Sequence, residues 1–391
     1  MSGEHGGSSE NTAAPQGAEA RKPEHLVPSP VRIIGTGLIG GSLGLALSAD
    51  GVQVQVQDAS PGTTALAVEM GVGQDAAAST EAPALVLVAA PPDVTAQLVH
   101  EALREWPEAI VADVASVKGT VLEQLRSLAR PEDLPRYIGA HPMAGREVSG
   151  VIAARGDLFR GRPFVVVPHE RTEPRAVSLL KALATQIGSV PTVLDASAHD
   201  LAVARISHVP QILSSLLAST LCEASEQALS LAGQGLRDTT RIADSDPRLW
   251  VEILGQNAAA IDTILEQVEQ QLQRTRGALG ILSGAAPSEG SPRRVLAHLI
   301  ADGNQGVHRI PGKHGGAGDD FATLIVLVPD APGELARLLT EIGEAGVNLE
   351  DLRLEHTLGR RVGLAHVSVQ RGREDRLTQA LTERGWHVEQ G

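Results

Sequence analysis

A glycine-rich turn between a strand and a helix constrains the fold of this chain more than any other feature. Residues 35–40 read GTGLIG, directly after the apolar run 31–34 and directly before a helix expected to open at residues 41–47. In such a G-x-G-x-x-G turn, Gly35 allows a tight bend, Gly37 lets the backbone approach a pyrophosphate, and Gly40 lets the helix pack on the strand. The helix N-terminus then faces the phosphates of a dinucleotide.

The expected second strand supports the same interpretation. Valines alternate with glutamines over residues 52–56, and Asp58 ends this strand about 20 residues after the turn. An acidic residue there hydrogen-bonds a ribose 2′-OH and repels a 2′-phosphate, and no arginine follows it, so the sequence predicts NAD rather than NADP. The residues predicted to bind the cofactor are Gly35, Thr36, Gly37, Leu38, Ile39, Gly40 and Asp58.

Strand and helix patterns alternate beyond this unit and predict an α/β Rossmann-like domain with a parallel, doubly wound sheet. Further strands are expected at 84–92, 109–116 and 163–169, and helices at 64–71 and 95–106. Long Ala/Leu-rich stretches at 199–230 and 246–282 predict an all-α second domain. Their many apolar stripes are explained either by a homodimer interface or by core packing.

The C-terminal part predicts a third domain with the order β-α-β-β-α-β, the ferredoxin-like split motif. Gly/Pro/Ser-rich segments on both sides of a short helix at 293–302 predict a linker before it. The expected organisation is a disordered tail at 1–29, a dinucleotide-binding domain at 30–195, a helical substrate and dimerisation domain at 196–282, a linker at 283–319 and a regulatory domain at 320–391.

Composition limits the possible partners and compartments. The net charge is −14 with no block of Lys or Arg, which argues against nucleic-acid binding. The N-terminus has no apolar core of a signal peptide, and no stretch is expected to reach the apolar length of a membrane span. A cytoplasmic protein is therefore predicted. The single cysteine, Cys222, permits no intrachain disulfide and is expected to be a small core residue.

Two polar stretches of the first domain are candidates for chemistry. Ser116 and Lys118 lie in ADVASVKG, at the carboxyl end of an expected strand, where such sheets bind ligands. His141 lies in GAHPMAGREVSG, a composition that predicts a loop rather than a helix or strand, with Pro142 favouring an extended conformation at His141. Structural alternatives are that His141 stabilises its loop and that Ser116 is an ordinary turn residue.

The helical domain supplies further candidates. His208 precedes Pro210, which should break a helical turn and form a pocket wall. Arg237 and Arg241 are one helical turn apart and suit a substrate with carboxylates. A new helix is expected after a cap at Ser245 or Asp246. The alternatives are that His208 is a buried structural histidine and that Arg237 is a surface residue paired with Asp238 or Asp244. No metal site is predicted, because the histidines lack a tight ligand cluster.

These motifs together resemble the prephenate dehydrogenase family, in the form that carries a C-terminal ACT domain. The resemblance covers residues 30–391 and rests on GTGLIGGS, DVASVKG, HPMAGREVSG, SHVPQ, TRIADSDPRLW and VPDAPGELA in this order. It implies oxidative decarboxylation of prephenate to 4-hydroxyphenylpyruvate in tyrosine biosynthesis, with NAD accepting the hydride.

The resemblance also implies roles for individual residues. His141 matches the histidine that accepts the hydroxyl's hydrogen bond, and Ser116 matches a serine near this histidine and the nicotinamide. Arg241 matches an arginine that binds a substrate carboxylate, and Glu147 matches an acidic residue that helps to gate the pocket. His208 matches the first histidine of the family's SHxPH helix.

One position departs from that pattern: Gln211 stands where many relatives have a second histidine that helps to hold the substrate. Glutamine forms hydrogen bonds but does not become cationic near neutral pH. Arogenate, which carries an amino acid in place of the keto acid, is therefore an open alternative substrate. Prephenate is the default expectation.

The C-terminal segment resembles ACT domains, which bind amino acids. Feedback inhibition by tyrosine is the hypothesis, and a dimerisation module without ligand is the alternative. The residues expected to form this regulatory site are Asp330, Pro332, Gly333 and Asn348.

Two other functions compete with this reading. A β-hydroxyacid dehydrogenase has a similar layout but uses a lysine in its helical domain, whereas this chain has Lys181 at the domain boundary and no lysine from 182 to 312. An NAD-binding regulator that uses the ACT domain as a sensor would not require the set of Ser116, His141 and Arg241.

Overall fold

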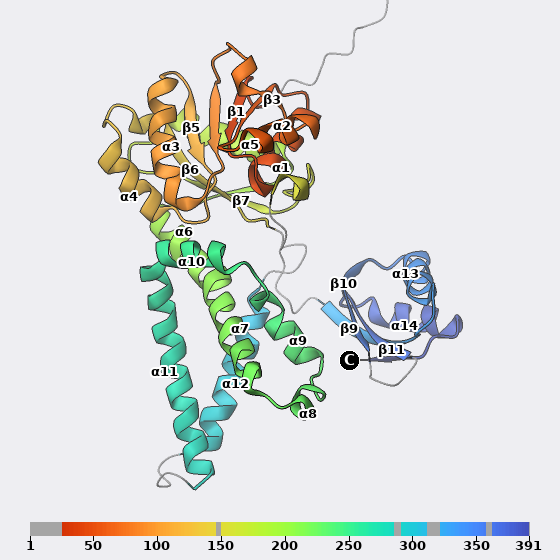
Figure 1. Cartoon of the computed structure of the whole chain (residues 1–391). Coiled ribbons are helices and arrows are strands. Elements are labelled where there is room, and N and C mark those ends of the chain that lie inside the picture. The colour runs from red at the N-terminus through yellow and green to blue at the C-terminus, as the bar shows by residue number, and fades with distance from the viewer. Residues whose placement is uncertain (1–25, 146–149, 285–290, 311–320, 357–361, 391) are drawn as a thin grey trace, which may run out of the picture. The chain divides into compact units, whose positions relative to one another are not determined.

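The computed structural model describes residues 26–145, 150–284, 291–310, 321–356 and 362–390 (Figure 1). Two compact units make up the chain. The first comprises Met1–Leu213 and Ile242–Ile264, and the second comprises Ser214–Arg241 and Leu265–Gly391. The predicted disordered tail at 1–29 lies almost entirely outside the described residues, and only its last four residues are described.

The first unit contains an eight-stranded sheet of order β3-β2-β1-β4-β5-β6-β7-β8. Its strands are β1 (Val31–Ile34), β2 (Val54–Gln57), β3 (Gln74–Asp75), β4 (Leu85–Val88), β5 (Ile110–Asp113), β6 (Tyr137–Pro142), β7 (Pro163–Val167) and β8 (Val190–Val193). The Rossmann-like fold is confirmed. The expectation of a purely parallel sheet is wrong, because β7 runs antiparallel to β6. A parallel pairing needs a long crossover, usually helical, whereas the described residues between these strands contain only a 3-10 turn at Val151–Ala153.

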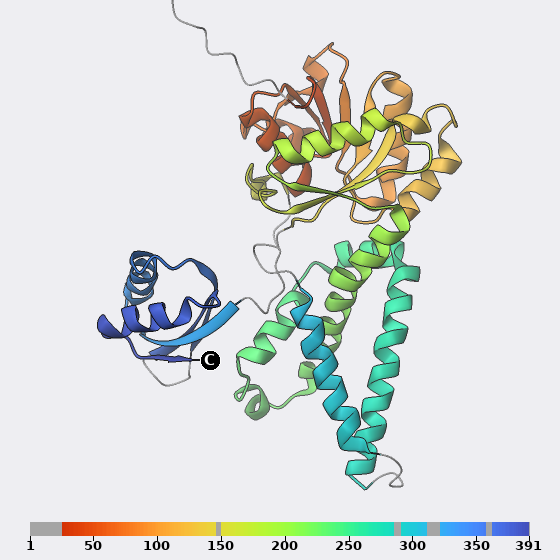
Figure 2. The ribbon, with the colours of Figure 1, turned by 180° about the vertical axis from the view of Figure 1, so that it is seen from behind.

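Helices cover both faces of this sheet, and two separate cores result (Figures 1 and 2). Leu85 and Leu87 of β4 belong to one core, and Val86 and Val88 belong to the other, as the alternation of side chains along a strand requires. The helices are α1 (Leu38–Ala49), α2 (Pro61–Glu69) and α5 (Pro174–Gln186) on the first face and α3 (Pro92–Glu105) and α4 (Gly119–Leu128) on the second.

His141 lies in strand β6, so the prediction of a loop at this position is wrong. It pairs with Val165 of β7, and Pro142 pairs with Phe164. On the other side, β5 pairs with β6 only as far as Gly139. Pro142 is therefore at an edge, where a residue without an N–H costs no ladder hydrogen bond. The composition of the segment does not indicate a strand. Its antiparallel partner lies more than twenty residues further along the chain, so no local pattern indicates the pairing either.

The turn after β5 is held by a buried ion pair. Lys118 forms an ion pair with Asp113 and donates a hydrogen bond to the carbonyl oxygen of Ala140 at 2.8 Å. Tyr137 donates its hydroxyl hydrogen to the other oxygen of Asp113 at 2.8 Å. The side chains of Lys118 and Asp113 are 1% and 0% exposed. This network ties the turn to β6 at the residue that precedes His141.

Helices follow the sheet along the chain, as predicted for the second domain. They are α6 (Ala196–Val203), a π-helical turn (Ala204–His208), α7 (Val209–Ser219), α8 (Glu226–Leu229), α9 (Gln234–Thr240), α10 (Pro247–Gln256) and α11 (Ala258–Leu282). The π turn ends directly before Val209 and Pro210, so the irregularity expected beside His208 is present. Asp246 caps α10 by accepting a hydrogen bond from the Arg248 N–H at 2.9 Å.

The continuous helix from Ala196 to Glu223 is 28 residues long with a mean hydropathy of 1.3, which is enough to cross a membrane by length and composition. The expectation that no stretch reaches that length is therefore wrong. This helix also carries buried His199, Asp200 and His208, whose side chains bond within the protein. Its apolar character is therefore combined with a polar face that is packed against other protein residues.

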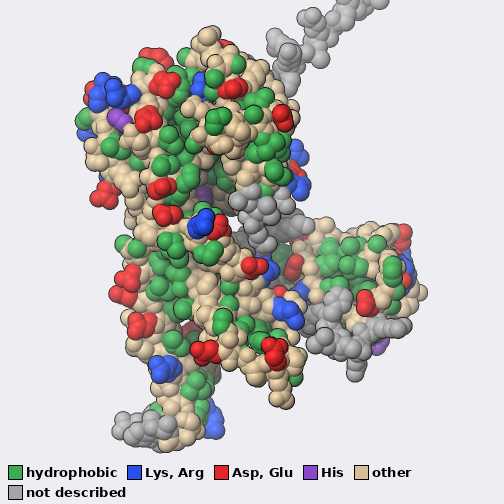
Figure 3. Space-filling model, in the orientation of Figure 1, with side chains coloured by type: hydrophobic (Ala, Val, Ile, Leu, Met, Phe, Trp, Pro, Cys, Tyr) green, Lys and Arg blue, Asp and Glu red, His purple; other side chains and the backbone are tan. Residues whose placement is uncertain are grey.

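Cys222 is exposed, so its predicted place in the core is wrong. Other side chains of the helical region are exposed in the same way, and Figure 3 shows hydrophobic side chains on its surface. Examples are Leu216, Val251, Leu272 and Ile300, which are 59%, 67%, 56% and 64% exposed. The apolar stripes of the sequence are thus incompletely buried within one copy of the chain.

The C-terminal region has the predicted order of elements. They are β9 (Phe321–Pro329), α13 (Glu334–Glu344), β10 (Leu349–His356), β11 (Val362–Gln370), α14 (Glu374–Glu383) and β12 (Val388–Gln390), with an antiparallel sheet of order β10-β11-β9-β12. Gly346 has φ +67° just after α13, the left-handed conformation in which helices commonly end. The helix expected within the linker, α12, is longer than predicted and spans Pro292–His308.

Lys118→Met should lower the free energy of unfolding of the first unit by about 3–5 kcal/mol, because it leaves the buried Asp113 carboxylate without its cation. Arg126→Met is the matched control, since the Arg126–Glu170 pair is 46% and 63% exposed and should contribute at most about 1 kcal/mol. Native-state hydrogen exchange of the amides in β4 and β5 measures both losses. Equal effects of the two substitutions would show that the buried pair does not stabilise the sheet.

Candidate active site

The glycine turn has the geometry that a dinucleotide phosphate requires. Gly35 has φ +94°, and a Cβ on Gly40 would lie 1.9 Å from the carbonyl oxygen of Gly35. A Cβ on Gly37 would meet no atom within 4 Å. Gly35 and Gly40 are therefore required by the fold, whereas the space beside Gly37, the N-cap of α1, is open to a ligand.

Asp58 is positioned by the same turn. Its Oδ2 accepts hydrogen bonds from the backbone N–H and the hydroxyl of Thr36 at 2.8 and 3.1 Å, and its Oδ1 accepts one from the Ser60 N–H at 3.0 Å. A carboxylate has about four acceptor sites, so capacity remains for a hydroxyl donor. The residues present therefore fit a dinucleotide with a free ribose 2′-OH.

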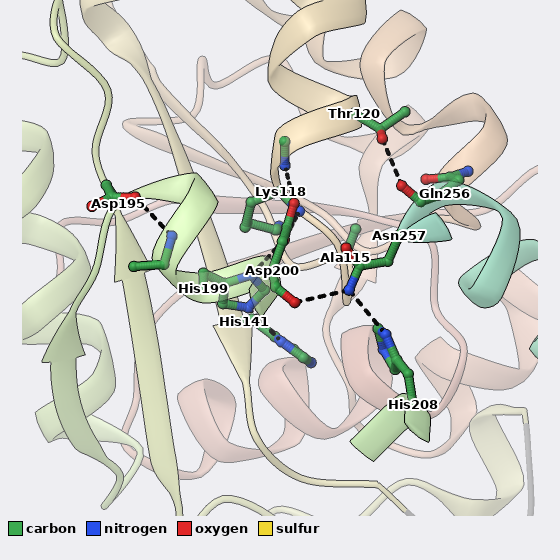
Figure 4. Close-up of polar contacts among 12 residues, drawn as sticks. Ala115, Lys118, Thr120, His141, Asp195, His199, Asp200, His208, Gln256 and Asn257 are labelled. Atoms are coloured by element: carbon green, nitrogen blue, oxygen red, sulfur yellow. Dashed lines mark hydrogen bonds and ion pairs between the residues drawn. The ribbon is translucent and has the colours of Figure 1, made fainter. Parts of the chain in front are cut away.

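A chain of three polar side chains begins at His141 (Figure 4). Nδ1 of His141 lies 2.9 Å from Nε2 of His199, and Nδ1 of His199 lies 2.8 Å from Oδ1 of Asp200. The carboxylate of Asp200 also accepts the backbone N–H groups of Lys118 and Gly119 at 2.9 and 2.7 Å, at the start of α4. The turn after β5 therefore holds Asp200, which in turn holds the two histidines.

These surroundings set the protonation of the site. Burial, together with the neighbouring His199, Lys118 and His208, holds the pKa of His141 well below 6.5. Burial alone would raise the pKa of Asp200. The hydrogen bonds from His199 and from the backbone at the start of α4 outweigh this effect, so the pKa lies below its usual value. A neutral imidazole thus lies near a charged carboxylate, the state that a general base needs before it accepts a proton.

A second histidine is held from another direction. The side-chain amide of Asn257 contacts the main-chain oxygen of Asp200 at 2.9 Å and Nδ1 of His208 at 3.0 Å. Burial is the main cause that lowers the pKa of His208 to about 4. The Trp250 ring meets the His208 ring edge-on, with centroids 6.1 Å apart. His208 is therefore a neutral, fixed side chain near neutral pH.

The remaining predicted residues are placed as follows. Ser116 is half-buried in the turn between β5 and α4, the turn that also supplies Lys118. Gln211 is buried on α7 and donates a hydrogen bond to the Ser245 hydroxyl at 2.8 Å. Arg237 and Arg241 belong to the second compact unit, and Glu147 lies outside the described residues.

Three residues of this site were missed by sequence reasoning: His199, Asp200 and Asn257. The adjacent His and Asp at the start of an expected helix were the only available signal for the first two. No feature of the sequence pointed to Asn257, because its two contacts are with residues 57 and 49 positions away in the chain. Among the described residues, no group of three or more His, Cys, Asp or Glu side chains is arranged to hold a metal ion.

Sequence models of two domains match the chain. Residues 43–193 match the nucleotide-binding domain of prephenate dehydrogenase, and residues 195–283 match its dimerization domain. The class defined by the fold and the site is thus a dehydrogenase with a nucleotide-binding domain followed by a helical domain. The chain belongs to the prephenate dehydrogenase family, and the family predicted from the motifs is confirmed.

Individual relatives agree with this assignment. The chain is 35% identical over 359 residues to the probable prephenate dehydrogenase NovF of Streptomyces niveus, covering 90% of this chain and 98% of that one. The structure is similar to arogenate dehydrogenase of Synechocystis, with 26% identity, a TM-score of 0.59 and coverage of 71% and 99%. It is also similar to prephenate dehydrogenase of A. aeolicus in complex with hydroxyphenyl propionate and NAD+, with 25% identity, a TM-score of 0.60 and coverage of 70% and 96%.

Gly37→Ala should weaken NAD binding at least tenfold with little loss of stability, because its methyl group enters open space that the cofactor needs. Gly40→Ala is the matched control within the same turn: its methyl group would overlap the Gly35 carbonyl and lower the melting temperature. Isothermal titration with NAD and thermal unfolding separate the two effects. Unchanged NAD affinity in Gly37→Ala would mean that the dinucleotide does not approach this turn.

Proposed function

We propose that this chain catalyses the oxidative decarboxylation of prephenate to 4-hydroxyphenylpyruvate. The enzyme class is an NAD-dependent oxidoreductase, as the family and the nucleotide-binding domain indicate. The observation that carries the proposal is the neutral imidazole of His141, held by His199 at the end of β6 in the nucleotide-binding domain. Bound NAD supplies the hydride acceptor.

The reaction needs one general base, which accepts the proton of the substrate's ring hydroxyl. Prephenate is a cyclohexadiene with a ring carboxylate, a ring hydroxyl and a pyruvate side chain. Its carbinol carbon loses a hydride while the hydroxyl proton is withdrawn, and loss of CO₂ then produces the aromatic ring. Nδ1 of His141 is engaged with His199, so Nε2 is the atom that accepts the hydroxyl proton. Ser116 is proposed to hydrogen-bond near this histidine and the nicotinamide.

The anionic groups of the substrate require cations or hydrogen-bond donors. Arg241 is proposed to bind a substrate carboxylate, with Arg237 one helical turn before it. His208 and Gln211 are proposed to contact the side chain of the substrate, and Glu147 is proposed to gate the pocket. The family resemblance supports these roles, and the buried positions of His208 and Gln211 on one continuous helix support a shared wall of the site.

Arogenate is the second candidate substrate. A relative with the same fold is an arogenate dehydrogenase, and Gln211 lacks the positive charge that a histidine could provide. Prephenate remains the first candidate, because several relatives of this chain are prephenate dehydrogenases by name.

The assembly and its regulation extend this proposal. The match to a dimerization domain and the exposed apolar side chains of the helices support a homodimer. The βαββαβ order of the C-terminal region supports an ACT domain that binds tyrosine beside Gly333, which has φ +90° at the start of α13. Asp330, Pro332 and Asn348 are proposed to complete this regulatory site. A cytoplasmic location stays a prediction.

His141→Asn should reduce kcat with prephenate by about 10²- to 10⁴-fold, because it removes the base. NAD affinity should be unchanged, and His387→Asn, an exposed substitution, should have wild-type activity. The low pKa of His141 also predicts that kcat/KM of the wild-type enzyme stays high well below pH 6.5 as the pH falls. NADH absorbance with prephenate and, separately, with arogenate measures these values. Turnover of neither compound by the wild-type chain contradicts the proposal.

Tyrosine should inhibit the full-length enzyme, and a chain that ends before residue 318 should keep its activity without this inhibition. The physical reason is a coupling free energy between the regulatory and catalytic sites, of about 1–3 kcal/mol. Initial rates at increasing tyrosine, with phenylalanine as the control amino acid, measure it. Equal inhibition of both chains would locate tyrosine in the active site instead.

A further inference from the structure

We propose that Asp200 sets opposite tautomers in the two site histidines, leaving Nε2 bare on His141 and protonated on His208. His199 transmits this effect to His141, and Asn257 transmits it to His208. These three residues are therefore positioning residues rather than catalytic ones. Their effect on turnover rests on the proposed function, whereas the tautomers themselves do not.

The first half of the argument follows the hydrogens outward from the Asp200 carboxylate. An ionised carboxylate only accepts hydrogen bonds, so the 2.8 Å contact needs a proton on Nδ1 of His199. The proposal assigns His199 a single ring proton, and with that proton on Nδ1 its Nε2 is an acceptor. The 2.9 Å contact to Nδ1 of His141 then needs a proton on that atom, and Nε2 of His141 keeps its lone pair.

The second half starts at the main-chain oxygen of Asp200. This oxygen only accepts, so the Asn257 atom 2.9 Å away is the amide nitrogen. The same nitrogen lies 3.0 Å from Nδ1 of His208, and its second hydrogen points there. Nδ1 of His208 is therefore an acceptor, and the proton of this neutral ring is on Nε2.

The two rings then offer complementary chemistry to one substrate. Nε2 of His141 accepts a hydroxyl proton, while Nε2 of His208 donates a hydrogen bond to a carbonyl or carboxylate oxygen. When His141 takes the proton it becomes an imidazolium, and its Nδ1 hydrogen stays directed at His199. The Asp200 carboxylate at the end of this chain stabilises the new charge, which the buried Lys118 ammonium would otherwise oppose.

The primary test is to observe the tautomers directly. Long-range ¹H–¹⁵N correlation spectra of the full chain, labelled at histidine nitrogens, distinguish protonated from bare ring nitrogens at neutral pH. His141→Asn and His208→Asn variants assign the signals. The proposal expects a proton on Nδ1 of His141 and on Nε2 of His208. The opposite tautomer in either ring, or a doubly protonated His199, overturns it.

Asp200→Asn tests the first branch. Oδ1 of Asp200 accepts both the His199 ring N–H and the Lys118 N–H, and Oδ2 accepts the Gly119 N–H, so an amide NH₂ in either place faces an N–H group and loses a bond. The neutral amide then no longer holds the proton on Nδ1 of His199, and His141 should lose its single tautomer. We expect kcat to fall about 10²- to 10⁴-fold, with KM for NAD near the wild-type value. Asp195→Asn is the matched control: Asp195 is an exposed carboxylate that caps the same helix by accepting the Ala198 N–H at 2.8 Å. Its rate should be unchanged.

Asn257→Leu tests the second branch. It removes the donor to His208 and leaves the His141 branch intact, so KM for prephenate should rise about tenfold, with a smaller change in kcat. The spectra serve as reciprocal controls, since each substitution should alter one histidine and not the other. A purely structural role would lower kcat and stability in both variants without changing either tautomer, and that result rejects the proposal. If prephenate is not the substrate, no turnover of it can be measured in any variant. The spectra still show whether each histidine has the proposed tautomer.

Discussion

The buried ion pair between Lys118 and Asp113 is the constraint on which the site depends. An ammonium removed from water needs a close anion and further acceptors, and Asp113 and the Ala140 carbonyl supply them. This arrangement binds the turn after β5 to the strand that carries His141. The backbone of the same turn binds the Asp200 carboxylate. One buried cation therefore connects the sheet to both ends of the histidine chain.

The sheet topology explains why the site lies where it does. In open α/β sheets, ligands bind at the carboxyl ends of the strands. Here the glycine turn follows β1, Asp58 follows β2, and the Asp113–Gly119 turn follows β5. His141 reaches the same edge because β6 is parallel to β5. The antiparallel β7 then supports β6 beyond the point where β5 ends, which keeps His141 in a rigid strand.

Helix α6 and the π turn after it bring polar groups into an apolar helix. This segment is apolar enough to resemble a membrane span, yet it carries His199, Asp200 and His208. Each of these buried groups is satisfied by a partner outside its own helix, which buried polar groups in a protein interior require. The π turn ends at His208 and separates it from Asp200, and such turns are common at functional sites.

The sequence by itself determined the glycine turn, Asp58, the βαββαβ order of the C-terminal region and the family, because each rests on local backbone geometry or on motif spacing. It also singled out His141 and His208. It did not reveal the strand at His141, the exposure of Cys222 or the antiparallel β7. Only the tertiary structure decided which groups His141 contacts, since its bond to His199 spans 58 residues and the bond from Lys118 to Asp200 spans 82. Such pairings arise from packing of distant elements, and no local pattern encodes them.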